Sequence, residues 1–330
     1  MKIAINGFGR IGRAVFKIAL ERGLNVVAIN DLHGIEDAVY LLKYDSVYGR
    51  YDKRIGIDGE HLSVDGHRVK VLSEGEPLRL PWKKLGVDVV IESTGAFTEV
   101  KKAAKHLKAG AKKVLISAPC KGPGLIIVPG VNDSMLTKKD DVISVASCTT
   151  NCLAPVAKIL NDNFVIKEAD MTTIHAYTAS QALVDSSDSK KRRGRAAAMN
   201  IVPTTTGASE AVEYVLPELR GKIKGMAMRV PVPDGSVVDL VAEVERAVDV
   251  KKVNAAFKRA AKKEMKGILE YTEDEIVSSD VIGNSHSAVV DGLSTQVHGD
   301  LIKVVAWYDN EYGYSNRLID VVERLKKWVR

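Results

Sequence analysis

The sequence has few cysteines and lacks long apolar runs, low-complexity segments and internal repeats. Three cysteines in 330 residues, an odd and small number, exclude the disulfide framework of a small secreted protein. No apolar run reaches the length of about 18 residues that a membrane-spanning helix needs. The opening MKIAINGFGR already has a strand pattern, which leaves no room for a signal peptide. We therefore expect a cytoplasmic protein with no membrane partner.

Basic residues outnumber acidic ones by 48 to 42, but the two kinds are interspersed along the chain. One basic cluster stands out, KKRRGR at 190–195. Because the charge is otherwise spread, we expect no specific nucleic-acid partner, and the basic excess fits small phosphate-bearing ligands equally well. The length and the 45% of apolar residues predict about two globular domains.

The first half alternates strand and helix patterns, which predicts a doubly wound, parallel α/β sheet. A helix is expected at 10–22, ended by Gly23, and a second at 98–111, closed by Gly110. Asp65-Gly66 predicts a hairpin turn in a small antiparallel insertion. The expected strands are 2–6, 25–30, 69–72, 87–92, 113–117 and 142–146.

The second half has longer strand patterns, which predict an α+β domain with an antiparallel sheet and helices on one face. The expected helices are 148–161 and 250–265. The expected strands are 171–176, 225–232, 237–245, 287–290 and 303–307. The tail from Ser315 to Arg330 carries an apolar stripe at helical spacing, with Ser315 as the expected cap.

The motif NGFGRIG places Gly7, Gly9 and Gly12 between the first strand and the first helix. There the glycines allow a tight turn, close approach of a pyrophosphate, and close helix–strand packing. Asp31 ends the second strand, at the distance expected for a carboxylate that bonds an adenosine ribose and repels a 2′-phosphate. The motif predicts a nicotinamide dinucleotide, NAD rather than NADP. The alternative is a structural turn with a surface aspartate.

Two cysteines lie four residues apart in SVASCTTNCLAP. No further Cys or His stands at ligand spacing, so we expect no metal site. Cys152 would lie one turn inside the helix and is expected to be a small buried side chain. Cys148 would start the helix, where the partial positive charge and unpaired N–H groups stabilise a thiolate and an oxyanion. This setting predicts a nucleophile, with buried packing as the alternative.

A nucleophilic cysteine needs a base, and His175 in MTTIHAYT is the best candidate because it ends a strand among hydroxyl residues. The settings of His286 and His298 are less clear. Four other histidines fall in polar segments that we expect to be exposed: His33, His61, His67 and His106.

Several motifs together resemble the glyceraldehyde-3-phosphate dehydrogenase family, in the family's order and over the whole chain. They are INGFGRIGR, ASCTTNCLAP, TTIHAYT, NIVPTTTGA, RVPVPDGSVVDL and WYDNEYGYSNR. The resemblance implies an NAD-binding domain at 1–147, on which the C-terminal helix 312–330 packs, and a catalytic domain at 148–311. It also implies a homotetramer.

The resemblance implies that Cys148 attacks the aldehyde of D-glyceraldehyde 3-phosphate and that His175 is the base. A thiohemiacetal and then an acyl thioester form, and inorganic phosphate releases 1,3-bisphosphoglycerate. The residues implied to bind the substrate or the two phosphates are Ser147, Thr149, Thr178, Arg193, Thr206, Gly207 and Arg229. Besides the glycines and Asp31, the residues implied to bind the cofactor are Arg10, Ile11, Thr94, Ser117, Asn310 and Tyr314.

The match departs from the family at two places near the adenosine. The segment 74–77 reads EGEP and lacks a basic residue, and Ser186-Ser187 follow Asp185 where NAD-specific members usually carry Leu-Pro. Asp31 favours NAD, whereas these two departures favour tolerance of a 2′-phosphate. We therefore expect NAD to be preferred, with some use of NADP. The alternatives are an erythrose-4-phosphate dehydrogenase, an aspartate-semialdehyde dehydrogenase, which the later motifs do not resemble, and a non-catalytic dinucleotide-binding protein.

Overall fold

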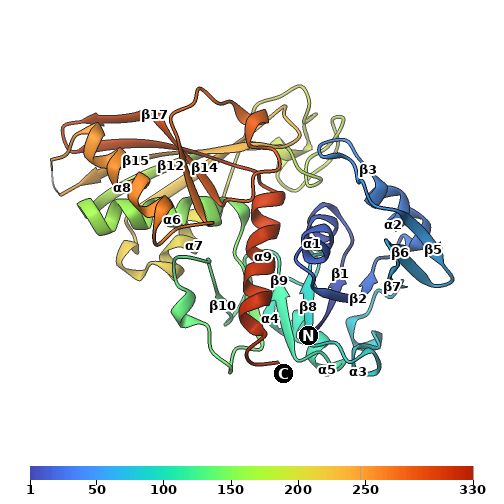
Figure 1. The fold of residues 1–330 in the computed structure, drawn as a ribbon. Helices are drawn as coiled ribbons and strands as arrows, with labels where there is room; N and C mark the ends of the chain where they lie inside the picture. The colour runs from blue at the N-terminus through green and yellow to red at the C-terminus, as the bar shows by residue number, and fades with distance from the viewer. Residues whose placement is uncertain (246, 330) are drawn as a thin grey trace. The chain divides into compact units, whose positions relative to one another are not determined.

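The computed structural model describes residues 1–245 and 247–329, which form two compact units (Figure 1). The first unit comprises Met1–Ile127, Ser134–Ala146 and Ser315–Arg330. The second unit comprises Val128–Asp133 and Ser147–Tyr314. Residues 128–133 belong to the second unit although the segments on both sides of them belong to the first. The sequence did not indicate this. Within the described ranges, we find no helix whose length and apolarity would let it cross a bilayer.

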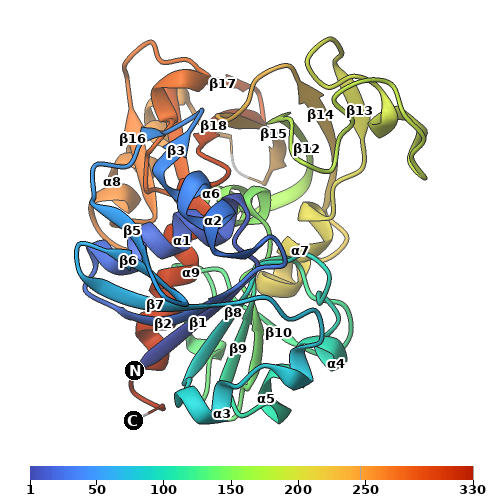
Figure 2. The same ribbon diagram turned by 90° about the vertical axis from the view of Figure 1, so that its right-hand side faces the viewer.

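The first unit is built on a nine-stranded sheet in the order β10-β11-β9-β8-β1-β2-β7-β6-β5 (Figure 2). From β10 to β7 the pairings are parallel, and β5 and β6 extend the β7 edge with antiparallel pairing. The order reverses between β1 and β8, the switch point of a dinucleotide-binding fold. The strands are β1 (Lys2–Asn6), β2 (Asn25–Asn30), β5 (Ile55–Asp58), β6 (His61–Val64), β7 (His67–Leu72), β8 (Val89–Glu92), β9 (Lys113–Ile116), β10 (Leu125–Ile126) and β11 (Val142–Ser144).

Both faces of this sheet are buried, as a parallel sheet requires. On one face Ala4, Ala28 and Val90 pack against Trp82. The residues that follow them in the strands, such as Ile5 and Ile91, point to the opposite face and are also fully buried. The helical segments of the unit are α1 (Arg10–Glu21), α2 (Gly34–Lys43), η1 (Pro77–Arg79), α3 (Trp82–Leu85), α4 (Val100–Ala103) and α5 (Lys105–Lys108), and β3 (Tyr44–Asp45) pairs with β4 (Gly49–Arg50).

Two expectations for the first unit need correction. The predicted helix at 98–111 is two short helices, α4 and α5, separated at Ala104, where ψ of −12° tightens the turn. His106 on α5 is fully buried rather than exposed. The Asp65-Gly66 turn and the small antiparallel insertion are confirmed: both residues have positive φ, and the turn joins β6 and β7 at the antiparallel edge of the nine-stranded sheet.

The second unit contains a seven-stranded sheet in the order β13-β14-β12-β15-β18-β17-β16. It was predicted to be antiparallel but is mixed, because β12 pairs with β14, and β16 with β17, in parallel. Sequence periodicity cannot reveal this, since strand direction depends on the crossover connections. The strands are β12 (Ile166–Ala176), β13 (Val202–Thr204), β14 (Ile223–Val230), β15 (Ser236–Val244), β16 (Leu269–Thr272), β17 (Ala288–His298) and β18 (Leu301–Tyr308).

Helices cover one face of this sheet (Figure 1). The central helix α6 (Cys148–Phe164) contacts four of the strands and is buried over most of its length. Side chains along β15 and β18 alternate between buried and half-buried or exposed, as expected when the other face is less covered. The other helical segments are η2 (Asp133–Met135), η3 (Lys191–Gly194), α7 (Ala208–Val215), η4 (Pro217–Leu219), α8 (Val250–Lys262) and η5 (Ser278–Val281).

The last helix, α9 (Tyr312–Leu325), begins three residues before Ser315, the residue that the sequence pattern indicated as its cap. Ser315 is fully buried inside the helix and is not its cap. Asp309 has that role, since its carboxylate accepts hydrogen bonds from the N–H groups of Glu311 and Tyr312. The part of α9 in the first unit is tied to α1 through Arg22, which donates to Asp320 at 2.6 Å.

Candidate active site

Cys148 is the first residue of α6. The side chain of Ser147 caps this helix by accepting a hydrogen bond from the N–H of Thr150 at 3.1 Å. Ala146, just before the cap, has a φ of +53°, a backbone conformation that non-glycine residues rarely adopt. Strain of this kind is often retained at functional sites, where it aims a side chain. The local sequence thus brings a partly buried thiol to the positive end of a 17-residue helix.

His175 lies one residue before the end of β12 and faces Cys148. Its Nε2 is 3.4 Å from the Cys148 Sγ, and its Nδ1 is 2.7 Å from the carbonyl oxygen of Ala176. The parallel register of β12 and β14 places Arg229 directly beside His175. The structure therefore brings together the predicted nucleophile, the predicted base and a predicted phosphate ligand.

Burial dominates the electrostatics of this cluster. It lowers the pKa of His175 to about 3, helped by the nearby Arg229 charge, so the imidazole is neutral. Burial also raises the pKa of the Cys148 thiol above its ordinary value, although Arg229 and hydrogen bonds from Thr149 oppose that rise. The position at the helix terminus led us to expect a low pKa for the Cys148 thiol. This expectation is wrong, because burial outweighs the effect of the helix terminus. The resting pair is a thiol beside a neutral imidazole, a base that can accept the proton.

Arg229 competes for the same hydrogen-bonding groups as His175. Its Nη1 lies 2.8 Å from the Ala176 carbonyl and 2.7 Å from His175 Nδ1. A guanidinium only donates, so this contact favours the imidazole tautomer with its hydrogen on Nε2. The Ala176 carbonyl favours the opposite tautomer, with a lone pair on Nε2 toward the sulfur. The position of Arg229 therefore influences whether His175 can act as a base.

The predicted phosphate ligands lie on the loops around β12, β13 and α7. Arg193 donates from Nε to the hydroxyl of Thr204 at 2.9 Å and is partly buried. Gly207 precedes the first residue of α7, and the hydroxyl of Thr206 accepts from the N–H of Ala208.

Two other predicted phosphate ligands make contacts of their own. The hydroxyl of Thr178 lies 2.9 Å from that of Ser180. Thr149 differs from expectation, because it is 4% exposed and its hydroxyl meets that of Tyr308 in the interior. Its side chain is therefore engaged in packing and not presented to an anion.

The predicted cofactor residues of the first unit surround a cavity of about 330 Å³ at the carboxyl ends of the strands. Gly7, Gly9, Asp31 and Thr94 line it. A Cβ on Gly7 would meet the Thr94 nitrogen at 2.6 Å, and φ is +93° there, so only glycine fits. Around Gly9 there is open space, and α1 begins there without a side-chain cap, which leaves helix N–H groups for a pyrophosphate. These features fit a dinucleotide.

Asp31 presents a carboxylate at one end of this cavity. Its Oδ2 accepts from the N–H of Phe8 at 2.8 Å, and its Oδ1 accepts from the N–H of His33. Burial alone would raise the pKa of Asp31, but these hydrogen bonds hold it below its usual range. The carboxylate is therefore ionised, as ribose binding and rejection of a 2′-phosphate require.

Other predicted cofactor residues do not line the cavity. The Arg10 side chain pairs with Asp45 at 2.7 Å, so only its backbone N–H remains suited to a phosphate. Gly12 packs against Gly7, whose carbonyl a Cβ would meet at 2.1 Å, which confirms its predicted packing role. Ile11 and Ser117 are the other two predicted cofactor residues of the first unit that do not line the cavity.

Sequence reasoning missed several residues that do line the cavity, Asn6, Asn30, Ser93 and Phe97, whereas Glu74 belongs to the segment expected near the adenosine. The signal for the first two was available, because each is a polar residue that ends an apolar strand.

Asn310 and Tyr314 belong to the second unit. The hydroxyl of Ser236 accepts from the N–H of Ala176 at 3.0 Å, so its own hydrogen goes to the Asn310 Oδ1 at 2.5 Å. That bond fixes the amide orientation and leaves the amide nitrogen as the donor side of Asn310. Tyr314 is 4% exposed in the first turn of α9.

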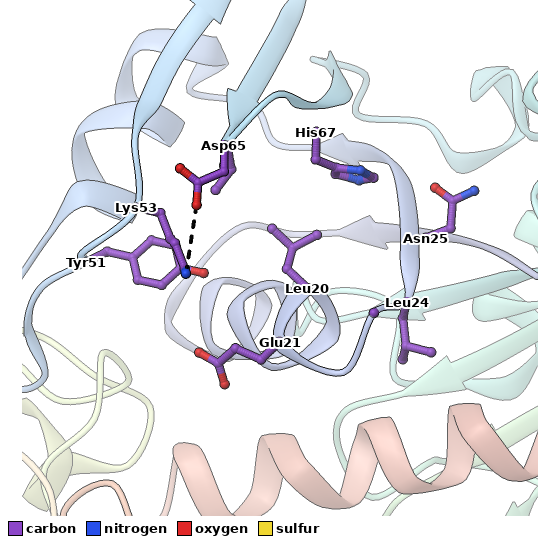
Figure 3. A pocket seen from close by; sticks show the side chains of 10 residues that line it. Leu20, Glu21, Leu24, Asn25, Tyr51, Lys53, Asp65 and His67 are labelled. Carbon is purple, nitrogen blue, oxygen red and sulfur yellow. Dashed lines mark ion pairs between the residues drawn. The ribbon is translucent and has the colours of Figure 1, made fainter.

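A larger cavity of about 590 Å³ lies elsewhere in the first unit, beside the end of α1 (Figure 3). Lys53 and Asp65 approach to 3.8 Å across it, and Glu21 and His67 also line it. None of the predicted site residues takes part in it. The larger of the two cavities therefore holds none of the predicted site residues, and size alone does not identify the functional site.

Comparisons with known proteins agree with the geometry. Residues 1–100 match the family model "Glyceraldehyde 3-phosphate dehydrogenase, NAD binding domain", and residues 147–310 match "Glyceraldehyde 3-phosphate dehydrogenase, C-terminal domain". The chain is 53% identical over 330 residues to glyceraldehyde-3-phosphate dehydrogenase 1 of Bacillus subtilis (99% of this chain, 98% of the relative). It is 55% identical over 324 residues to the Geobacillus stearothermophilus enzyme (97% of each), and 51% over 335 residues to that of Borreliella burgdorferi (99% and 100%). The resemblance seen in the sequence is confirmed.

Proposed function

The chain belongs to the glyceraldehyde-3-phosphate dehydrogenase family, and we propose that Cys148 and His175 carry its phosphorylating oxidation of glyceraldehyde 3-phosphate with NAD. The observation that carries the proposal is the 3.4 Å approach of His175 Nε2 to the Cys148 Sγ at the start of α6. A thiol next to a neutral imidazole at a helix N-terminus is suited to attack a carbonyl carbon.

The reaction starts when the Cys148 sulfur bonds to the aldehyde carbon and its proton passes to His175. The imidazolium returns that proton to the new oxyanion, which gives a thiohemiacetal. NAD, when bound, supplies the hydride acceptor of the oxidation. His175 removes the hydroxyl proton as the thioester forms on Cys148. A phosphate oxygen then bonds to the acyl carbon, the carbon–sulfur bond breaks, and the thiolate is released.

Arg229 links substrate binding to the base. We assign it to the substrate phosphate, for which a guanidinium offers paired donors. When Arg229 turns from His175 to that phosphate, Nδ1 keeps its hydrogen for the Ala176 carbonyl, 2.7 Å away. Nε2 then presents its lone pair to the sulfur. The base is thus in its active tautomer when substrate is present.

The remaining phosphate contacts are assigned to residues on the loops of the second unit. Thr178 joins Arg229 at the substrate phosphate. Arg193, Thr206 and Gly207 serve the attacking phosphate, with Arg193 held in place through Thr204. Ser147 and Thr149 contribute through their position at the start of α6, where backbone N–H groups point outward.

NAD is assigned to the cavity lined by Gly7, Gly9, Asp31 and Thr94. We propose that the N–H groups of Arg10 and Ile11 bind the pyrophosphate and that Asn310 donates to the carboxamide. Ser117 is assigned to the nicotinamide ribose and Tyr314 to the ring. The ionised Asp31 favours NAD, and the small residues Gly75, Ser186 and Ser187 leave room for some use of NADP.

We propose that the protein acts as a homotetramer in the cytoplasm, with a cofactor domain at 1–147 plus 312–330 and a catalytic domain at 148–311. Large apolar side chains exposed on 177–201 and on the seven-stranded sheet support an interface between copies. They are Leu183, Val184, Met199, Met226, Val241 and Leu301. All three cysteines are free thiols, which suits a reducing compartment.

The test is phosphate-dependent reduction of NAD with glyceraldehyde 3-phosphate, compared with erythrose 4-phosphate. We expect rapid NADH formation with the triose that requires inorganic phosphate for turnover. Turnover that proceeds equally well without phosphate, and faster with the tetrose, would point to water as the acyl acceptor and contradict the proposal.

A further inference from the structure

A buried row of polar side chains runs beneath the cofactor cavity, across the ends of four neighbouring parallel strands. The Glu74 N–H donates to the Asn30 Oδ1, the Asn30 amide donates to the Asn6 Oδ1, and the Asn6 amide donates to Glu92, at distances of 2.9, 2.7 and 2.5 Å. These residues follow or end β7, β2, β1 and β8 in the order of the sheet. Beyond Glu92 stand His106 and Trp82.

The direction of every hydrogen bond in this row is fixed from its two ends. A backbone N–H can only donate, so Glu74 sets the orientation of the Asn30 amide and, through it, that of Asn6. An indole N–H can only donate too, and that of Trp82 lies 2.9 Å from His106 Nδ1. His106 Nδ1 is therefore the acceptor of this bond, and Nε2, which lies 3.0 Å from Glu92, is the donor.

Glu92 is the acceptor on which both directions converge. Asn6 and His106 donate to one carboxylate oxygen, and the N–H and hydroxyl of Thr94 donate to the other. These four contacts satisfy both oxygens of the Glu92 carboxylate. The side chain is 1% exposed and holds a buried negative charge through hydrogen bonds rather than through a cationic partner.

Of the residues that donate to Glu92, Asn6 and Thr94 line the cavity, where Asn6 is buried and Thr94 is exposed. Its hydroxyl hydrogen goes to Glu92, and its oxygen accepts from the N–H of Ala96 at 3.1 Å, so Glu92 fixes the turn at 94–96. The same turn packs against Gly7, where no side chain would fit.

We propose that Glu92 is a positioning residue for the cofactor, which holds Thr94 in place for the nicotinamide ribose through a row oriented by Trp82 and His106. The inference rests on the proposed placement of that ribose beside Thr94. Glu92 bonds to Asn6, His106 and Thr94, and none of these bonds reaches Asp31, to which the proposed function assigns the adenosine half. Glu92 therefore determines how firmly the reacting half of NAD is held, and leaves the adenosine half unaffected.

The test compares the binding of NAD and AMP by calorimetry in the full-length protein. In Glu92→Gln the amide nitrogen faces hydrogen-bond donors, and we expect the Kd for NAD to rise about tenfold to a hundredfold. Thr94 is exposed, so the protein should fold without its hydroxyl, and Thr94→Val should raise the Kd for NAD about threefold to tenfold. AMP should bind both variants within about twofold of the wild type, by the same affinity scale.

Glu99→Gln is the matched control, since it removes a carboxylate from the same loop that pairs only with Lys102 at the surface. It should leave both Kd values unchanged. An equal loss of NAD and AMP, or no loss of NAD in Thr94→Val, would overturn the inference. If the variants lose affinity for NAD but not for AMP, while the wild type shows no phosphate-dependent reduction of NAD, the proposed function alone is overturned.

Discussion

Replacing His175 with asparagine removes the only imidazole at the Cys148 sulfur in the described structure. Burial raises the pKa of the thiol and lowers that of His175 to about 3, so at neutral pH the proton starts on sulfur and the lone pair on nitrogen. The neighbouring Arg229 cannot take the proton, because a guanidinium stays charged. Without His175 the thiol has no neighbouring base among the described residues to take its proton, and only Arg229 and Thr149 remain to favour its ionisation.

The magnitude follows from the role of a general base. Such a group contributes about a hundredfold to ten-thousandfold, or about 3 to 5 kcal/mol of activation free energy. We expect the upper part of this range, because the buried thiol gains little from water. The rate of the first NADH burst, measured by stopped flow with saturating NAD and substrate, should fall about a thousandfold or more.

His298→Asn is the control, because His298 is exposed at the end of β17. It should leave the burst unchanged, and NAD should bind the His175 variant normally, since the cavity that we propose for NAD lies in the first unit. A burst in the His175 variant within about threefold of the wild type, far below the contribution of a general base, would refute the assignment of the base.

Three further predictions follow from the same geometry. Cys148→Ser should abolish NADH formation while NAD binding persists, whereas Cys152→Ser, at a fully buried position, should retain turnover; activity in the first variant would exclude a thioester route. Asp31→Asn removes the charge that opposes a 2′-phosphate and should shift the kcat/KM ratio toward NADP by about tenfold, and an unchanged ratio would locate specificity elsewhere. Because burial depresses the pKa of His175 from 6.5 to about 3, the unfolded chain binds its proton first as the pH falls below 6.5. The free energy of unfolding should therefore decline as the pH falls toward 3, with up to about 1.4 kcal/mol per pH unit coming from His175. Urea titrations of His175→Asn should lack this contribution. If the free energy of unfolding changes with pH equally in the variant and the wild type, a buried neutral imidazole is ruled out.

Local patterns in the sequence were sufficient to predict the position of Cys148 at the start of α6 and the dinucleotide fold. Cys148 stands where a strand pattern changes to a helix pattern, and the glycine motif stands at the first such change. Both depend on neighbours within one turn, so the sequence carries them directly. The α/β fold follows for the same reason, from alternation along the chain.

Features that depend on distant residues were not predictable. The parallel pairing that sets Arg229 beside His175 joins strands 54 residues apart. His106 looked exposed because its sequence neighbours are lysines, yet its ring is buried between Trp82 and Glu92. The thiol pKa of Cys148 was expected to be low because only the helix terminus is visible in the sequence, whereas burial depends on the whole unit.

The central claim is that the oxidised substrate becomes bonded to the sulfur of Cys148. Mass spectrometry of the protein, quenched in acid after reaction with glyceraldehyde 3-phosphate and NAD in the absence of phosphate, tests it directly. The account predicts one 3-phosphoglyceroyl group per chain on the peptide that contains Cys148, and its loss when phosphate is added before the quench. An adduct on another residue, or NADH formed with no adduct at any time, would contradict it.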